Sequence, residues 1–121
     1  MVKIEEIMIG DWLLYLSDKP ENAFPVQVTA DMFKHELTLW PEIFDYLELK
    51  PEMLNSKSTG FSSNLYWLDD SETKMLKSWS DGSWELNMNF GHSQIIMDFK
   101  HVHKLQHALK LYNVEYELNI E

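Results

Sequence analysis

The sequence predicts an α+β fold: an antiparallel meander and one main helix near the C-terminus, preceded by a small N-terminal β unit. Three patterns predict this class. Residues 83–90 alternate apolar and polar side chains, the two-residue period of a half-buried strand. Pairs suited to tight turns, Asp81-Gly82 and Gly91-His92, lie on either side of it. Apolar residues then recur at helical spacing over 101–112, and a helix commonly covers the apolar face of an antiparallel sheet.

The N-terminal unit is predicted from two short apolar stretches, residues 11–16 and 26–29. We expect both to be strands, with the polar segment 17–20 as a turn region between them. Residues 36–40 and 44–49 could extend this unit as further strands.

The middle of the chain contains connections rather than long elements. Pro51 can open a short helical turn that runs through Leu54, because proline is tolerated in a first turn. Residues 55–63 and 69–73 are polar and predict loops. Neither loop is long enough to divide domains, so we expect residues 1–121 to form a single compact α+β domain.

The two turns of the meander predict its register. A two-residue turn at Asp81-Gly82 would place Trp79 opposite Trp84, and Leu65–Leu68 is an alternative first strand of the sheet. The second turn would pair Trp84 with Phe99, Leu86 with Met97 and Met88 with Ile95. These six side chains are expected on one buried face, with Glu85, Asn87 and Asn89 on the other.

The C-terminal helix presents one apolar face, made by Val102, Leu105, Ala108, Leu109 and Tyr112. Asn113 can end this helix. Beyond it, Tyr116, Leu118 and Ile120 alternate with polar residues, which predicts a closing strand that returns to the sheet.

Composition excludes several classes of protein. A chain of 121 residues with 45% hydrophobic residues can bury a core without disulfides or metal. Zero cysteines remove disulfides, thiolate catalysis and cysteine-based metal sites. The longest apolar run, Trp12–Leu16, is far too short to span a membrane, and Glu5 and Glu6 interrupt any signal-like start. We therefore expect a cytoplasmic protein.

The charge is strongly acidic and unevenly distributed. The chain has 20 Asp and Glu against 10 Lys, with no Arg, for a net charge of −10. Residues 1–72 carry 14 acidic side chains and 5 Lys, a balance of −9, whereas residues 73–121 carry 6 and 5, a balance of −1. Such a surface repels nucleic acid and attracts basic protein surfaces, although acidity also serves solubility alone.

The histidines of the predicted helix suggest a metal site at first sight, because His103 and His107 are four residues apart. A zinc-protease helix needs Glu directly after the first His, and this sequence has Lys104 there. A non-catalytic site that adds Asp98 or His92 is an alternative to solvent-facing histidines. We expect no metal.

Other catalytic patterns are missing from the sequence. It contains no G-x-S-x-G motif, and its four glycines are too scattered to form a phosphate-binding loop. We therefore expect no enzymatic activity, no catalytic residues and no cofactor.

Two kinds of side chain are candidates for binding another protein. Trp12 and Trp40 are possible aromatic anchors, because tryptophan dominates binding hot spots. The acidic residues expected on turns or the surface are Asp18, Glu21, Glu42, Asp45, Glu48, Asp69, Asp70 and Glu72.

Four stretches, in chain order, carry a resemblance to a known group: Ile9-Gly10-Asp11-Trp12, Pro25-Val26-Gln27-Val28-Thr29, Pro51-Glu52-Met53-Leu54 and His101-Val102-His103-Lys104-Leu105-Gln106-His107. Over most of its length the chain resembles small uncharacterised proteins of gut-type bacteria and their prophages. The group has no assigned activity, and the resemblance implies a phage or mobile-element origin.

That origin suggests a function by binding. Small acidic phage proteins commonly disable one host protein, so we expect an anti-CRISPR-like inhibitor of an RNA-guided immune nuclease that acts by protein-protein contact. The partner would be a host protein with a basic surface, such as the nuclease or its guide complex, and not free nucleic acid or a membrane. The alternatives are an accessory protein of phage replication or assembly, and a small metal-dependent enzyme.

Overall fold

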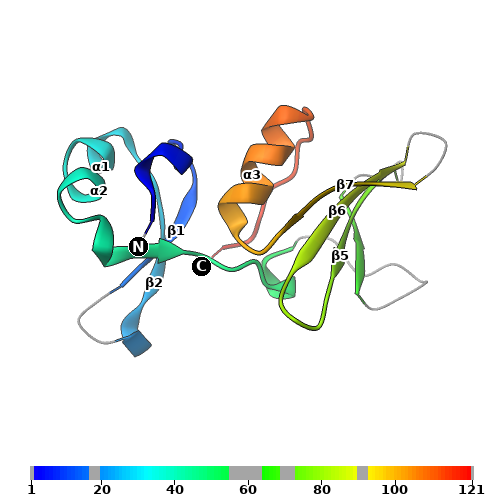
Figure 1. Ribbon diagram of the computed structural model, residues 1–121, viewed down its shortest axis with the longest axis horizontal. Coiled ribbons are helices and arrows are strands. Elements are labelled where there is room, and N and C mark those ends of the chain that lie inside the picture. The colour runs from blue at the N-terminus through cyan, green and yellow to red at the C-terminus, as the bar shows by residue number, and fades with distance from the viewer. Residues whose placement is uncertain (1, 17–19, 55–63, 69–72, 90–92, 121) are drawn as a thin grey trace.

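Two antiparallel sheets lie on either side of one helix, α3 (Val102–Leu111), which confirms the α+β class (Figure 1). The computed structural model describes residues 2–16, 20–54, 64–68, 73–89 and 93–120. We call the described residues up to 46 the N-terminal lobe and those from 47 onward, which include α3, the C-terminal lobe. The predicted turn at Gly91-His92 and the predicted loop at 55–63 lie outside the described residues.

The N-terminal lobe contains a three-stranded sheet in the order β2-β1-β3. The central strand β1 (Trp12–Tyr15) pairs antiparallel with both β2 (Phe24–Gln27) and β3 (Phe44–Tyr46). The lobe's small core is made by Val2, Ile7, Leu13, Val28, Leu37 and Phe44. Short 3-10 turns precede or connect the strands at η1 (Ile4–Glu6), η2 (Pro20–Asn22) and η3 (Pro41–Ile43), and a fourth, η4 (Pro51–Met53), follows in the C-terminal lobe.

The predicted strand at residues 36–40 is wrong, because this segment is helical. Two short helices, α1 (Ala30–Lys34) and α2 (Glu36–Leu39), cover the N-terminal sheet. The Thr29 side chain accepts a hydrogen bond from the Met32 amide and so caps α1. Phe33 of α1 and Leu37 of α2 both pack into the lobe's core, on either side of a break in the helical backbone at His35.

The C-terminal sheet is a four-stranded meander in the order β4-β5-β6-β7. Its strands are β4 (Leu65–Trp67), β5 (Lys74–Ser78), β6 (Trp84–Asn89) and β7 (Ser93–Phe99). The strand predicted as an alternative at Leu65–Leu68 is present as the edge strand β4, which pairs with β5. The predicted pairs Trp84 with Phe99 and Leu86 with Met97 are confirmed.

The turn between β5 and β6 is longer than predicted. Ser78 pairs with Trp84, and the Trp79 amide donates to the Ser83 carbonyl, so three residues rather than two form the loop. Gly82 has a φ of +88°, the left-handed conformation such loops require. Trp79 therefore does not face Trp84, as predicted, but is 45% exposed.

A β-bulge between β6 and β7 overturns the remaining predicted pair. The register shifts after Leu86, so that Asn87 pairs with Ile95 and Met88 with Gln94. The extra residue, Ile96, lies in β7 and turns the residues of β7 that precede it to the opposite face. Ile95 is consequently exposed, not buried as predicted. Asn87, which was expected on the polar face, is also buried, while Leu86 and Met88 on either side of it keep their predicted place in the core.

α3 packs its apolar face on this sheet. Val102, Leu105, Ala108 and Leu109 are buried with sheet residues in one core cluster, but Tyr112 at the helix end is partly exposed. Among the described parts of the chain, no helix combines the length and the apolar character needed to cross a bilayer.

The closing strand predicted after α3 is wrong. Asn113 ends the helix with a φ of +55°, but no strand forms from there to residue 120. The predicted alternation nevertheless holds, since Tyr116, Leu118 and Ile120 pack against the core. The Asn119 amide donates to the Met53 carbonyl, so this segment is bound to η4 rather than to a sheet edge.

Candidate functional site

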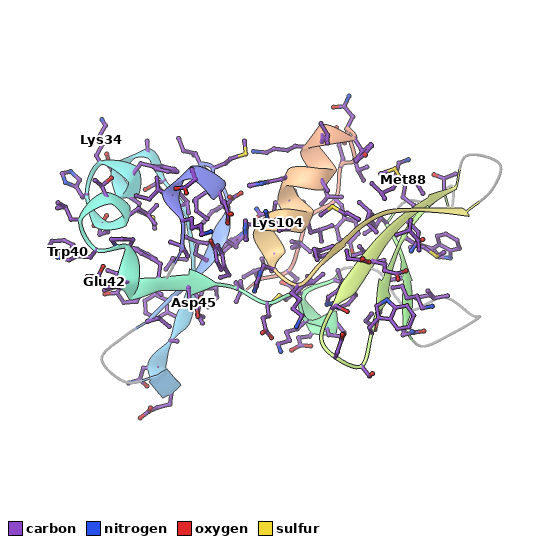
Figure 2. All side chains as sticks on the ribbon, viewed as in Figure 1. Lys34, Trp40, Glu42, Asp45, Met88 and Lys104 are labelled. Atoms are coloured by element: carbon purple, nitrogen blue, oxygen red, sulfur yellow. The ribbon has the colours of Figure 1, made fainter. Side chains whose placement is uncertain are left out.

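The outer end of the N-terminal lobe carries an exposed aromatic and acidic group of side chains. Trp40 directly follows α2 and is 51% exposed, and its neighbour Leu39 is also exposed. Pro41 begins the 3-10 turn η3, and Glu42 in this turn has an exposed side chain. Figure 2 shows Trp40 and Glu42 at the end of the lobe remote from α3. We call Leu39, Trp40 and Glu42 the outer patch.

The other acidic candidates are dispersed. Glu21 is exposed at η2, and Glu48 is exposed but lies 3.3 Å from the Lys50 ammonium. Asp45 is half-buried on β3, and its carboxylate accepts a hydrogen bond from the Tyr46 amide. Asp18, Asp69, Asp70 and Glu72 lie outside the described residues. Of the predicted site residues that the structure describes, Trp40 and Glu42, two positions apart in the sequence, lie at the same end of the lobe (Figure 2).

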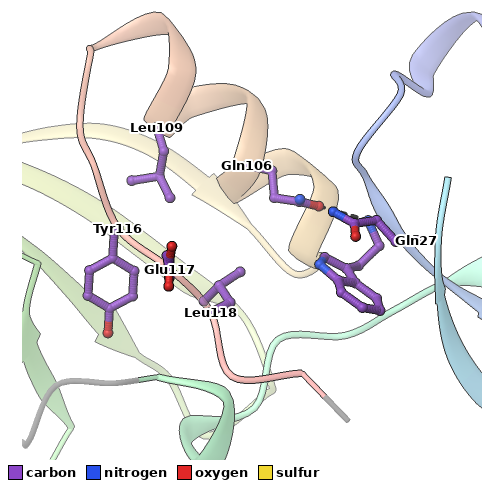
Figure 3. A pocket seen from close by; sticks show the side chains of 7 residues that line it. Gln27, Gln106, Leu109, Tyr116, Glu117 and Leu118 are labelled. Carbon is purple, nitrogen blue, oxygen red and sulfur yellow. Dashed lines mark hydrogen bonds between the residues drawn. The ribbon is translucent and has the colours of Figure 1, made fainter. Parts of the chain in front are cut away.

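Trp12 has a different place from Trp40. It is half-buried, packs against the C-terminal core, and its amide donates to Oε1 of Gln106 in α3 at 2.9 Å. Its indole lines a hollow of about 280 Å³ between the lobes, together with Gln27, Gln106 and residues 116–118 (Figure 3). The amide groups of Gln27 and Gln106 both donate to the Gly10 carbonyl. Trp12 therefore belongs to the junction of the lobes, which leaves Trp40 as the exposed anchor of the predicted pair.

A buried carboxylate completes this junction. Asp11 is buried, and its Oδ2 accepts a hydrogen bond from the Met8 amide and lies 2.8 Å from Nε2 of His107. We call the set Gly10, Asp11, Trp12, Gln106 and His107 the interlobe contact. Asp11 was not among the predicted site residues. Its partner His107 lies 96 positions away in the sequence. All five residues of the interlobe contact nevertheless fall within two of the stretches that carry the resemblance, 9–12 and 101–107, and these stretches are the sequence signal for the contact.

His103 lies beside the interlobe contact in an unusual environment. It is buried, and neither ring nitrogen has a hydrogen-bond partner in the structure as described. Its ring stacks on that of Tyr46, with centroids 4.8 Å apart, and contacts His107 edge-on. Burial lowers the pKa of His103 to about 4, so the ring is neutral at pH 7. This histidine therefore joins α3 to β3 as an uncharged packing residue.

Tyr46 extends the stack to the first turn of the chain. Its hydroxyl donates to Oε2 of Glu6 at 2.9 Å, and this hydrogen bond lowers the pKa of the Glu6 carboxyl. Burial raises the pKa of the Tyr46 hydroxyl and lowers that of His101, whose ring centroid lies 5.1 Å from that of Tyr46. Nowhere in the described ranges do three His, Asp or Glu side chains gather in a way that could hold a metal ion.

No family model, curated protein or solved structure matches this chain.

Proposed function

We propose that this protein acts by binding, without catalysis or a cofactor, and that it docks its outer patch on a basic surface of a host protein. The observation that carries the proposal is Trp40, a large aromatic side chain that stands 51% exposed beside an exposed leucine. Adjacent exposed apolar side chains rimmed by polar residues are a feature of protein-interaction sites. Burial of the pair against a partner would supply the affinity, because tryptophan is the residue most enriched in binding hot spots.

Charge supports a basic partner. Residues 1–72 carry the −9 balance, and the outer patch itself includes the exposed carboxylate of Glu42. Long-range attraction of an acidic lobe to a basic surface accelerates encounter, and the tryptophan then forms the close contact. The same charge disfavours binding to free nucleic acid, whose phosphates it repels.

We propose an RNA-guided nuclease, or its complex with guide RNA, as the partner. Such nucleases hold guide and target in basic channels, which suits an acidic ligand. The resemblance to phage-type proteins supports this choice over other basic host proteins. Occupation of the channel would block target binding, so the protein would act as an anti-CRISPR-like inhibitor.

The test is a binding and cleavage assay against the nucleases of the native host, with and without guide RNA. We expect binding that weakens as salt rises, because exposed charges are screened beyond a Debye length of about 8 Å at physiological ionic strength. Trp40→Ala should weaken binding by at least about tenfold, the loss typical of a hot-spot residue. Glu42→Lys should mainly slow association.

Trp79→Ala is the matched control, since Trp79 is 45% exposed but lies in the C-terminal lobe. It should leave binding unchanged. Equal losses from the two tryptophan variants would contradict the assignment to the outer patch. Binding to free nucleic acid as tight as to any protein, or no effect on any nuclease of the host, would contradict the proposed function.

A further inference from the structure

β7 is an edge strand whose outer side is largely unused. β6 pairs with its inner side, and the sheet order ends at β7. Among the described residues, backbone pairing on this side occurs just beyond the strand, where the Leu49 amide donates to the Lys100 carbonyl and Glu48 bridges His101. No strand in the described segments pairs with the outer side of Ser93–Phe99. Exposed N–H and C=O groups along such an edge favour the addition of another strand.

An apolar groove borders this edge. It measures about 370 Å³ and is lined by Ile96 and Met97 of β7 and by residues of α3 and its end, namely Lys104, His107, Ala108, Leu111 and Tyr112. Ala108 belongs to the core cluster, so the groove lies where the helix meets the sheet. Leu111 is 77% exposed. A strand added to β7 would lie beside this groove and cover it.

The β-bulge adds a second apolar feature to the same strand. Because the register shifts there, Ile95 points away from the core and is 59% exposed. Natural edge strands usually carry features that limit pairing, such as charges, proline or a β-bulge, and β7 has a bulge and an exposed Asp98. The exposed position beside the bulge nevertheless holds Ile95, a β-branched apolar residue of a type enriched in paired strands.

The charge distribution indicates what covers this face. Two copies of a chain with a net charge of −10 repel each other, and the repulsion is weakest where the local charge is near zero. Residues 73–121, which contain β7 and α3, carry a balance of only −1. Lys100, Lys104 and Asp98 border a second hollow at the end of β7, so both signs of charge are available there. A second copy can therefore bind at β7 and α3 with the least electrostatic repulsion.

We propose that β7 is a self-association edge, on which the β7 strand of a second copy pairs antiparallel about a two-fold axis. The two C-terminal sheets then form one continuous sheet, and each groove is covered by the other copy's strand. An antiparallel pair of identical strands is self-complementary and closes at two copies. The proposal goes beyond the binding function, because β7 lies on the far side of α3 from Trp40 (Figures 1 and 2).

The experiment is sedimentation velocity on the full chain from about 1 µM to about 1 mM, the range in which weak to moderate interfaces become occupied. The mass should rise from 14.4 kDa toward twice that value. Ile95→Lys should raise the dissociation constant by at least about tenfold, because it places a charge in the new interface. Ile9→Lys is the matched control: Ile9 is 57% exposed in the N-terminal lobe, and its substitution should leave self-association unchanged.

A second measurement needs no variant. Hydrogen exchange of the β7 amides should slow as the concentration of the unmodified protein rises, while exchange in β4, at the other edge, stays constant. A mass of 14.4 kDa across the whole range would overturn the proposal and assign the edge to a strand of another protein. Retained self-association in a folded Ile95→Lys variant, or an equal loss in Ile9→Lys, would also overturn it.

Discussion

The two lobes differ in how much of their structure they stabilise by themselves. Among the described residues, thirteen buried apolar side chains form the C-terminal core, whereas six form the N-terminal one. The free energy gained by burying six apolar side chains exceeds the cost of the conformational entropy lost on folding by little. The N-terminal lobe therefore depends on the interlobe contact, through which Asp11 and Trp12 bind α3. We infer that one lobe is stable by its core and the other by its attachment.

The largest effect is expected in the smaller core. Phe44→Ala removes a fully buried ring from a cluster with few other members and should cost about 3–5 kcal/mol. We expect the N-terminal lobe to open locally, which native-state hydrogen exchange would detect as lost protection in β1 while β6 stays protected. Equal loss of protection in both strands would contradict the unequal stability of the lobes.

A core substitution in the larger lobe should act globally. Leu86→Ala should cost about 2–5 kcal/mol in denaturant unfolding, because it leaves a cavity in the buried centre of β6. Both β1 and β6 should lose protection together, since α3 loses the surface on which it packs. Leu39→Ala, the same change at an exposed position, is the control and should cost less than about 0.5 kcal/mol.

Acid should weaken the attachment between the lobes through His103. Its pKa is about 4 when folded and 6.5 when unfolded, so the unfolded chain binds more protons between these values. Stability should therefore fall as the pH drops from about 6.5 to about 4, by up to about 3 kcal/mol. Unfolding measured across this range would show the slope.

Two variants separate His103 from other groups that titrate in the same range. His103→Gln should flatten the slope, whereas His35→Gln, at an exposed histidine, should leave it as it is. An unchanged slope in His103→Gln would assign the acid sensitivity to other groups.

Local patterns predicted the meander well and its irregularities poorly. The alternation from Trp84 to Met88 identified β6 and two of its pairs with β7. A period of two residues cannot reveal a bulge, however, because one inserted residue leaves the composition of β7 unchanged while it turns Ile95 outward. Similarly, Asp81-Gly82 marked a turn, but the loop length that exposes Trp79 depends on the pairing of the whole hairpin.

The candidate site was predictable only where it is local. Trp40 and Glu42 were chosen from residue type and a turn-like context, but the same reasoning chose Trp12, which is half-buried against the C-terminal core. The pairing of Asp11 with His107 spans 96 positions, and neither the helical spacing nor the charge pattern links the two. His103 was expected to face solvent, and its burial against Tyr46 follows from the docking of one lobe on the other.

The interlobe contact also sets an order of events during synthesis. Asp11 and Trp12 leave the ribosome early, but Gln106 and His107 follow only after every strand of both sheets has been made. Until α3 emerges from the ribosome, a nascent N-terminal lobe therefore has only its own small core and cannot form the interlobe contact. Contacts so distant in sequence close slowly, because the chain between them must first be ordered. Docking of the lobes is thus the late step of folding, and the interval before it is when the chain is most exposed to chaperones and proteases.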